Sequence, residues 1–396
     1  MPTLTELLRR RAADIAEPIS PSPESSASLP REFYYAPAVF EAEKQKIWFR
    51  NWIFVGLVDD VRSPGDYFTA AIVDQQIYVI RSQDGVLRAF YNVCQHRAHT
   101  LLEGKGSLGR GPVRCPYHSW AYDSFGNLKS APYAEEVADF DYDRFCVPEI
   151  KVETLGPMVF INLEDDADPL SETVGDLLDM FTRAVPRFDE LSLVRTAQYD
   201  LNCNWKLVLD GLECYHCPFI HPEAMGPGNS YLEKSFEMSA GRYHQQHLSH
   251  LKKEVASDPS LLPFQIASNS VEDLYVWYLW PNLLFASRPG DSNWQILETL
   301  PLGPETSVHN LYNFSINNPP KEADISQMDF YQNVLWPQDR TAILRQGKGV
   351  RTRGYIRGRY MVDKDHSWWS ECGTHHFNKL VWDALKGNSF DISRVD

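Results

Sequence analysis

The chain has 396 residues, enough for two or three domains, and 43% of them are hydrophobic and 23% charged, as is typical of soluble globular proteins. Its formal net charge of −15 disfavours nucleic acid as a partner. No apolar run reaches the ~20 residues that a membrane helix needs, and the first residues lack the apolar core of a signal peptide. The seven cysteines are odd in number and do not have the spacing of a disulfide framework. We therefore expect a cytoplasmic protein with no membrane partner.

Residues 1–48 are expected to form an N-terminal helical arm and linker. The stretch 20–30 is rich in Pro and Ser, as linkers are. From Ala38 to Trp52 the spacing of apolar residues becomes helical.

Residues 49–165 predict an all-β domain. They contain six short runs rich in β-forming residues, separated by turn signals such as Asp84-Gly85. The runs are IFVGLV, YFTAAIV, IYVIRS, VLRAFYNV, IKVETL and MVFINL.

Residues 166–396 predict a second domain of the α+β class. An amphipathic helix is expected at 174–185, strand-like runs lie between 274 and 316, and the segments 324–347 and 374–386 are helical again. This order favours helices packed on a curved antiparallel sheet.

Two cysteine–histidine pairs lie at the ends of predicted strands in the first domain. Cys94 and His96 form a C-x-H pair, and Cys115 and His118 form a C-x₂-H pair. A structural zinc site would more often pair Cys with Cys and His with His. A Rieske [2Fe–2S] cluster needs two Cys on one iron and two His on the other, so one of each from two loops fits it better.

Two further histidines, His216 and His221, are five residues apart in the second domain. On an ideal helix they would lie about 140° apart and could not share one ion. Pro218 is expected to end or bend the helix and to let the chain carry His221 back towards His216. Two His and a carboxylate from elsewhere would form the facial triad of non-haem Fe(II) oxygenases. A surface or core role for both His is the alternative.

The order CxH…CxxH followed by NWK…ExYHxxxxHP resembles the large (alpha) subunit of Rieske non-haem iron oxygenases, over about residues 45–390. The resemblance implies a Rieske domain followed by a helix-grip (Bet v1-like) catalytic domain, in an oxygenase that assembles as a ring, usually a homotrimer. The segment ECYHCPFIHPE looks most like the branch that oxidises betaine, stachydrine, choline and carnitine.

The resemblance also implies a third iron ligand on a late helix, and Asp339 is the predicted residue. Asp324, Asp329 and Asp363 are its competitors, in more polar surroundings. Glu213 is expected to lie on the same side of a helix as His216 and to link this iron ligand to His118 of a neighbouring subunit. Many relatives have Asp at the position of Glu213.

The sequence thus predicts the oxygenase component of a monooxygenase that hydroxylates an N-methyl group of a quaternary ammonium compound and releases formaldehyde. The chain lacks the GxGxxG fingerprint of a flavin or nicotinamide site, so a separate reductase must supply electrons. Cation–π attraction would suit such a substrate. Candidate aromatics are Tyr275, Trp277, Tyr278, Trp280, Phe285, Trp294, Tyr312, Phe314 and Trp336. An aromatic-ring dioxygenase, an aromatic O-demethylase and a non-catalytic Rieske electron carrier are the alternatives.

Overall fold

The computed structural model describes residues 19–213, 215–225, 230–367 and 370–386. Within these ranges the chain divides into two compact units: Lys44–Thr173, and the segment up to Glu43 together with Val174 onward. Residues 1–18 of the predicted arm lie outside the described residues. The domain boundaries expected after residues 48 and 165 stay predictions.

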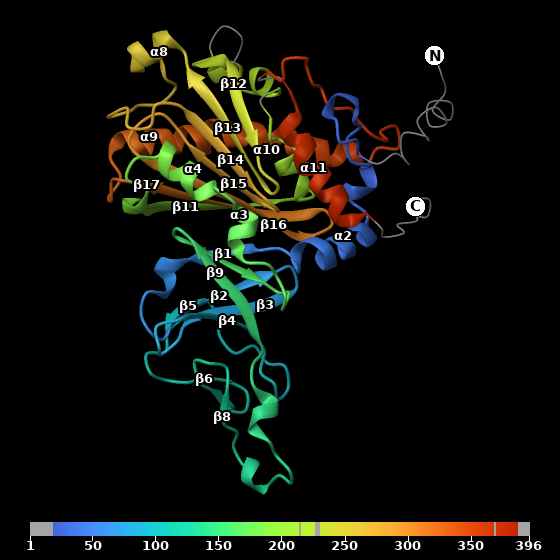
Figure 1. The fold of residues 1–396 in the computed structure, drawn as a ribbon, viewed down its shortest axis with the longest axis vertical. Coiled ribbons are helices and arrows are strands. Elements are labelled where there is room, and N and C mark those ends of the chain that lie inside the picture. The colour runs from blue at the N-terminus through green and yellow to red at the C-terminus, as the bar shows by residue number, and fades with distance from the viewer. Residues whose placement is uncertain (1–18, 214, 226–229, 368–369, 387–396) are drawn as a thin grey trace. The chain divides into compact units, whose positions relative to one another are not determined.

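The unit Lys44–Thr173 is built on a seven-stranded antiparallel sheet with the order β1-β10-β9-β4-β3-β2-β5 (Figure 1). A three-stranded sheet, β6-β7-β8, completes it. All six predicted β runs are confirmed as strands. The strands are β1 (Ile53–Leu57), β2 (Asp66–Ile72), β3 (Gln75–Arg81), β4 (Leu87–Tyr91), β5 (Lys105–Ser107), β6 (Val113–Arg114), β7 (Ala121–Tyr122), β8 (Leu128–Ser130), β9 (Glu149–Leu155) and β10 (Met158–Asn162).

The second unit contains a seven-stranded antiparallel sheet with the order β11-β17-β16-β15-β14-β13-β12. The α+β class and the curved sheet expected from the sequence are confirmed. Its strands are β11 (Ser192–Leu201), β12 (Leu232–Ala240), β13 (His244–Leu251), β14 (Leu274–Leu279), β15 (Leu283–Ser287), β16 (Asn293–Gly303) and β17 (Thr306–Ser315).

Helices cover both faces of this sheet (Figure 1). On one face, Phe181 of α4 (Leu177–Ala184) makes ring contacts at 5.0–5.1 Å with Trp277, Phe285 and Trp294. On the other, Trp336 of α10 (Trp336–Val350) stacks on His309 of β17 at 4.3 Å. Because side chains alternate along a strand, the two helices bury opposite faces.

The long helical segment near the C-terminus was predicted and is confirmed. It runs as α9 (Glu322–Phe330), a π-helical stretch η9 (Tyr331–Leu335) and then α10. Such π segments are often found at functional sites. The last helix, α11 (Cys372–Leu385), packs Phe377 against Trp205 and Tyr278. Among the described residues, none of the helices is both long and apolar enough to cross a membrane.

The other α-helices within the described ranges are short. They are α2 (Pro37–Glu43), α3 (Leu170–Val174), α5 (Lys206–Leu209), α6 (Cys217–Ile220), α7 (Pro222–Met225) and α8 (Lys253–Ser257).

The segment that carries His216 differs from the prediction of one helix ended by Pro218. Helix α5 already ends at Leu209, and α6 is a new one-turn helix with His216 at its N-cap and His221 at its C-cap. Pro218 lies in the first turn of α6, where the missing N–H breaks no helical hydrogen bond. The proline therefore starts a helix and does not end one.

Candidate metal centres and the catalytic cavity

The loops that carry the two Cys–His pairs share one backbone geometry. The amide of Cys94 donates to the carbonyl of His99, and the amide of Cys115 donates to the carbonyl of Trp120, both at 2.8 Å. In each loop the residue four positions after the Cys has positive φ, +56° at Ala98 and +62° at Ser119. Each Cys is therefore held at the same point of an equivalent tight loop.

The two cysteines of these pairs are buried, and the two histidines are exposed. Cys94 and Cys115 are 2% and 1% exposed in the core, whereas His96 and His118 lie at the surface. The two imidazole rings are 4.7 Å apart, centroid to centroid. This set offers buried thiols on one side and imidazoles on the other, which is the donor arrangement of a Rieske cluster.

Neighbouring residues adjust these donors. The indole of Trp120 stacks on His96 at 4.8 Å, and the hydroxyl of Tyr122 lies 3.4 Å from the sulfur of Cys94. Burial lowers the pKa of His96, and the charges of His118 and Arg97 lower it further. The neutral ring that results is the form that binds metal.

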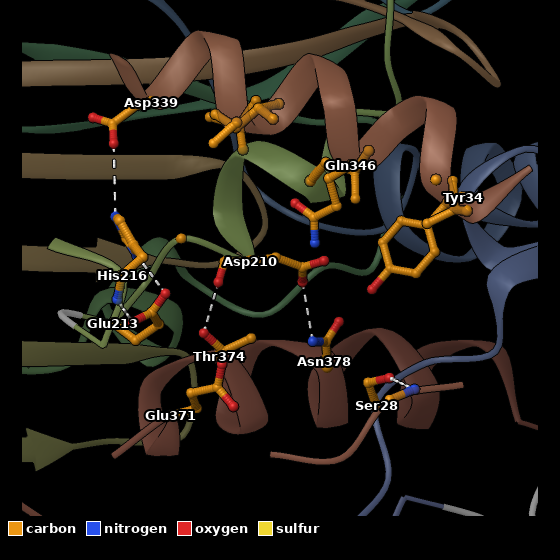
Figure 2. A pocket seen from close by; sticks show the side chains of 18 of the residues that line it. Ser28, Tyr34, Asp210, Glu213, His216, Asp339, Gln346, Glu371, Thr374 and Asn378 are labelled. Atoms are coloured by element: carbon orange, nitrogen blue, oxygen red, sulfur yellow. Dashed lines mark hydrogen bonds and ion pairs between the residues drawn. The ribbon is translucent and has the colours of Figure 1, made fainter. Parts of the chain in front are cut away.

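The second unit brings His216, His221 and Asp339 together. Asp339 Oδ1 lies 3.6 Å from His216 Nε2 and 3.1 Å from His221 Nε2. Asp339 stands in the first turn of α10, two residues after Pro337. Figure 2 shows the ring of His216 between Asp339 on one side and Glu213 on the other. Two imidazole nitrogens and one carboxylate thus face a common point, as a mononuclear iron site requires.

Each of these imidazoles has an acceptor on its other nitrogen. Glu213 accepts from His216 Nδ1, and Gln338 Oε1 accepts from His221 Nδ1 at 2.6 Å. Both Nε2 atoms are turned towards Asp339, and with a metal bound they would be the proton-free ligand atoms. Glu213 lies after the end of α5 and before the start of α6, so the expectation that it shares a helix with His216 is wrong. Sequence reasoning missed Gln338, whose only signal is its place beside Asp339.

The electrostatics of the site favour the charged forms of His216 and Asp339. Although burial opposes it, hydrogen bonds to Asp339 and Glu213 raise the pKa of His216 to about 10. Burial also opposes ionisation of Asp339, but hydrogen bonds from His216 and His221 lower the pKa of its carboxyl. Without metal, the proton of the His216 ring therefore lies between this imidazole and the carboxylate of Asp339, where a cation would bind.

A thiol that the sequence reasoning did not select also lies here. The sulfur of Cys217 and one ring nitrogen each of His216 and His221 all lie within 4.8 Å of one another. Its Sγ is 3.9 Å from His216 Nε2. The only signal in the sequence was its position directly after His216.

The three competing carboxylates are occupied elsewhere. Asp324 accepts from the backbone of Lys321 at the start of α9, at 2.8 Å. Asp329 pairs with Arg195 at 2.6 Å. Asp363 accepts from the backbone of Ser367 at 2.8 Å. None of these contacts involves His216 or His221.

A cavity of about 880 Å³ opens beside His216 and Asp339. Of the nine aromatics that the sequence suggested, only Trp336 lines it; Trp277, Phe285 and Trp294 fill the core under α4 instead. Other aromatic side chains line the cavity, and they come from outside the strands. They are Tyr34, Tyr331, Tyr355 and Tyr360.

Acidic groups also line the cavity. They are Asp210, Glu213, Asp339 and Glu371 (Figure 2). Burial raises the pKa of Asp210 to about 6, against hydrogen bonds from Tyr34 and Asn378 that lower it. The cavity therefore combines aromatic faces with carboxylates.

Comparisons with known proteins agree with this geometry. Residues 51–141 match the model of the Rieske [2Fe-2S] domain, and residues 188–387 match that of the ring hydroxylating alpha subunit (catalytic domain). The oxygenase subunit of carnitine monooxygenase from Escherichia coli (strain K12) is 30% identical over 92% of this chain and 96% of its own length.

A second curated relative and a solved structure are also similar. The oxygenase subunit of glycine betaine monooxygenase from Chromohalobacter salexigens is 34% identical over 52% of this chain and 45% of its own length. The crystal structure of a quaternary ammonium Rieske monooxygenase in complex with L-carnitine superposes with a TM-score of 0.81, at 28% identity, and covers 92% of this chain and 97% of that one. With a cluster-binding unit and a catalytic unit that both match, the chain belongs to the Rieske non-haem iron oxygenases, as a large subunit with a Rieske [2Fe–2S] domain and a mononuclear iron domain.

Proposed function

We propose that this subunit hydroxylates an N-methyl group of a quaternary ammonium compound. The observation that carries the proposal is the cavity beside His216 and Asp339, in which aromatic rings and carboxylates occur together. A quaternary ammonium group has no N–H to donate, so it is bound by aromatic faces and by negative charge. The similarity to relatives that are named carnitine and glycine betaine monooxygenases supports the same class of substrate.

The rings and acids have separate tasks in this proposal. Trp336 and Tyr331 stand on the same continuous helix as Asp339, so their faces would hold the cation near the metal. A desolvated cation–π contact contributes up to about 2 kcal/mol. Asp210 and Glu371 would add a long-range attraction for a positive substrate.

We assign the metal ligands from the donor sets. Cys94, His96, Cys115 and His118 would hold the [2Fe–2S] cluster, and His216, His221 and Asp339 would hold the mononuclear iron. When bound, the two groups supply electron transfer and O₂ activation.

The surrounding residues of this chain prepare the iron ligands. Glu213 and Gln338 keep the Nδ1 protons of the two imidazoles in place, so that both Nε2 lone pairs face the metal position. The carboxylate of Asp339 completes a −1 donor set.

The balance of the reaction defines what must be supplied. One atom of O₂ enters a C–H bond of the N-methyl group; the other leaves as water, with two electrons and two protons. The C–N bond of the resulting carbinol then breaks and gives formaldehyde and a tertiary amine. The electrons come from a separate reductase, the partner that the oxygenase family uses.

We further propose a closed ring of three subunits. In a head-to-tail ring each cluster can lie against the iron domain of its neighbour, and three is the simplest number that closes it. The surface position of His96 and His118 supports a role at such a boundary. Glu213 would then link His216 of its own subunit to His118 of the next. A cytoplasmic location stays a prediction of the sequence.

The test is a substrate panel. The purified, iron-loaded protein with a surrogate reductase is given methylated amines, betaines and aromatic acids, and O₂ uptake and formaldehyde are measured. We expect formaldehyde in proportion to O₂ from one or more quaternary ammonium compounds only. Oxygenation of the aromatic acids alone would contradict the proposal and favour a ring dioxygenase or an O-demethylase.

A further inference from the structure

Arg288, directly after β15, carries a buried positive charge in the catalytic unit. The residue is 6% exposed, and its backbone is fixed by Asn293, which accepts from the Arg288 amide at 3.1 Å. Its Nη1 donates to Gln295 Oε1, and its Cζ lies 4.8 Å from the ring centroid of Tyr331. These are a neutral acceptor and an aromatic face, and neither is a counter-charge; the charge of Asp339 acts on the guanidinium without a hydrogen bond between the two.

No carboxylate within the described ranges forms an ion pair with this guanidinium. Other cations in the same unit do have such partners. The fully buried ammonium of Lys206 pairs with Glu43, and Arg195 pairs with Asp329 at 2.6 Å. A buried charge without a counter-charge costs several kcal/mol, so Arg288 is an unusual feature to retain without a function.

The position of Arg288 relates it to the cavity. Gln295, its acceptor, stands two residues before Leu297 on β16, so the two side chains share one face of the sheet. Leu297 and Tyr331 both line the cavity. The guanidinium therefore lies on the cavity side of the sheet, next to a ring that lines the cavity.

The helical segment that carries Tyr331 and Asp339 gives the distance between the surroundings of Arg288 and the metal position. Tyr331 and Asp339 are eight residues apart on one continuous helical segment, roughly 12 Å at 1.5 Å per residue. A ligand with its N-methyl groups near Asp339 could thus place a second, anionic group towards Arg288.

We propose that Arg288 binds the carboxylate of the substrate and selects zwitterionic betaines over quaternary ammonium compounds that lack an acid group. This inference rests on the proposed function and narrows its substrate class. A guanidinium presents paired N–H donors that fit a carboxylate, and the substrate would supply the negative charge that the protein omits. The acidic side of the cavity and Arg288 would then fix the two ends of one dipolar molecule.

The test compares glycine betaine and L-carnitine, which carry a carboxylate, with choline, which carries a hydroxyl group. The values of kcat/KM for formaldehyde release are measured with wild type, Arg288→Met and the matched control Arg195→Met. In wild type the better carboxylate compound should exceed choline. In Arg288→Met that ratio should fall about 10- to 100-fold, the value of a charge-assisted hydrogen bond in a buried site. Arg195→Met should keep the wild-type ratio, because Arg195 already has Asp329 as its counter-charge.

The test does not depend on Arg288→Met being folded, because a second variant and a binding measurement on the wild type address the same question. Arg288→Lys keeps the charge but loses the paired donors, so it should show a smaller loss of the ratio. In wild type without turnover, the carboxylate compounds should raise the melting temperature more than choline at equal concentration.

The outcomes separate this inference from the proposed function. A preference of the wild type for choline, or a ratio unchanged in Arg288→Met and Arg288→Lys, overturns the role of Arg288 and leaves N-demethylation standing. Formaldehyde from no quaternary compound of the wider panel overturns the proposed function and, with it, this inference.

Discussion

Glu213 contacts His216 twice, through the backbone amide at 3.1 Å and through Nδ1 of the ring. The side chain of Glu213 is only 8% exposed. The carboxylate therefore holds both the backbone and the ring of a proposed iron ligand. Acceptors of this kind fix the tautomer and the orientation of the ring.

Glu213→Gln should retain both metals and slow catalysis. A neutral amide is a weaker acceptor for the Nδ1 proton, and losses of about 10- to 100-fold in activity are usual when such a contact is changed. Metal content, subunit mass and kcat are the measurements. The matched control is Glu237→Gln, an exposed glutamate 3.5 Å from His250 on the surface. Normal turnover by Glu213→Gln, or full activity of a monomer, would refute the link across the subunit boundary.

Replacement of His216, His221 or Asp339 by Ala should abolish turnover and leave the cluster spectrum intact. Each change removes one donor from the three that converge. Iron analysis should show loss of one iron per chain, with sulfide unchanged. Asp329→Asn is the control, because that carboxylate lies on the helical segment before Asp339 and faces Arg195. An Asp339→Ala protein that keeps its activity would mean that another carboxylate completes the site.

Cys94→Ala or Cys115→Ala should bleach the visible spectrum and destabilise the unit Lys44–Thr173. The cluster would close two loops that few other contacts hold, so its loss also removes folding free energy. The checks are the absorption spectrum, acid-labile sulfide and thermal unfolding. Cys146→Ala is the matched control, since its thiol is in the same unit and contacts only Asn127 weakly, at 3.9 Å. Bleaching by Cys146→Ala but not by Cys94→Ala would reverse the ligand assignment.

Strand positions and the donor sets could be read from the sequence because both depend on local pattern. Runs of β-forming residues between turn signals marked β1 to β4, β9 and β10, and the spacing of Cys and His marked the loops that carry the pairs. Asp339 was reached from a resemblance, not from local pattern, because nothing near it in the sequence points to His221, 118 positions earlier in the chain.

The cavity could not be read from the sequence, for a physical reason. Alternation shows that a strand has two faces, but not which helix covers each of them. Trp294 and Gln295 are neighbours on β16, yet the indole packs under α4 and the amide faces Arg288. Trp277, Phe285 and Trp294 therefore lie on the face away from the cavity, and Tyr34 and Tyr360, which are outside the strands, were missed.

The helix break at Asp210 was equally hidden. Gly211 follows the C-cap Asp210, and the contacts of Asp210 with Thr374 and Asn378 of α11 also hold the chain where α5 ends. Tertiary hydrogen bonds of this kind override weak local propensity.

Glu43→Gln should destabilise the catalytic unit by about 3–5 kcal/mol, the usual cost of leaving one partner of a buried ion pair uncompensated. Glu43 and Lys206 are both fully buried, and Glu43 also accepts from the indole of Trp205 at 2.9 Å. Urea unfolding of wild type and variant measures the difference. Asp383→Asn, which breaks a surface contact with Lys379, should cost less than about 1 kcal/mol. If the two variants lose similar amounts of stability, the charge of Lys206 is not left uncompensated when the carboxylate of Glu43 is removed.

Glu298 should make the protein less stable as the pH rises. The residue is 3% exposed, and burial raises the pKa of its carboxyl from 4.5 to about 7, opposed by one hydrogen bond from Asn310 at 2.9 Å. Between these two pH values the folded state holds a proton that the unfolded chain has lost, so the stabilisation is complete below pH 4.5 and disappears as the pH passes 7.

Glu298→Gln removes this dependence, since an amide stays neutral and can still accept from Asn310. At pH 4 the variant and the wild type should have nearly equal free energies of unfolding. At pH 8 the variant should be more stable by roughly 3 kcal/mol, the value of about 2.5 pKa units. Urea unfolding at the two pH values is the measurement, and Glu272→Gln, at an exposed position, is the control that should track the wild type at both. If Glu298→Gln follows the wild type across the whole range, the carboxyl is solvated in solution and is not the buried acid described here.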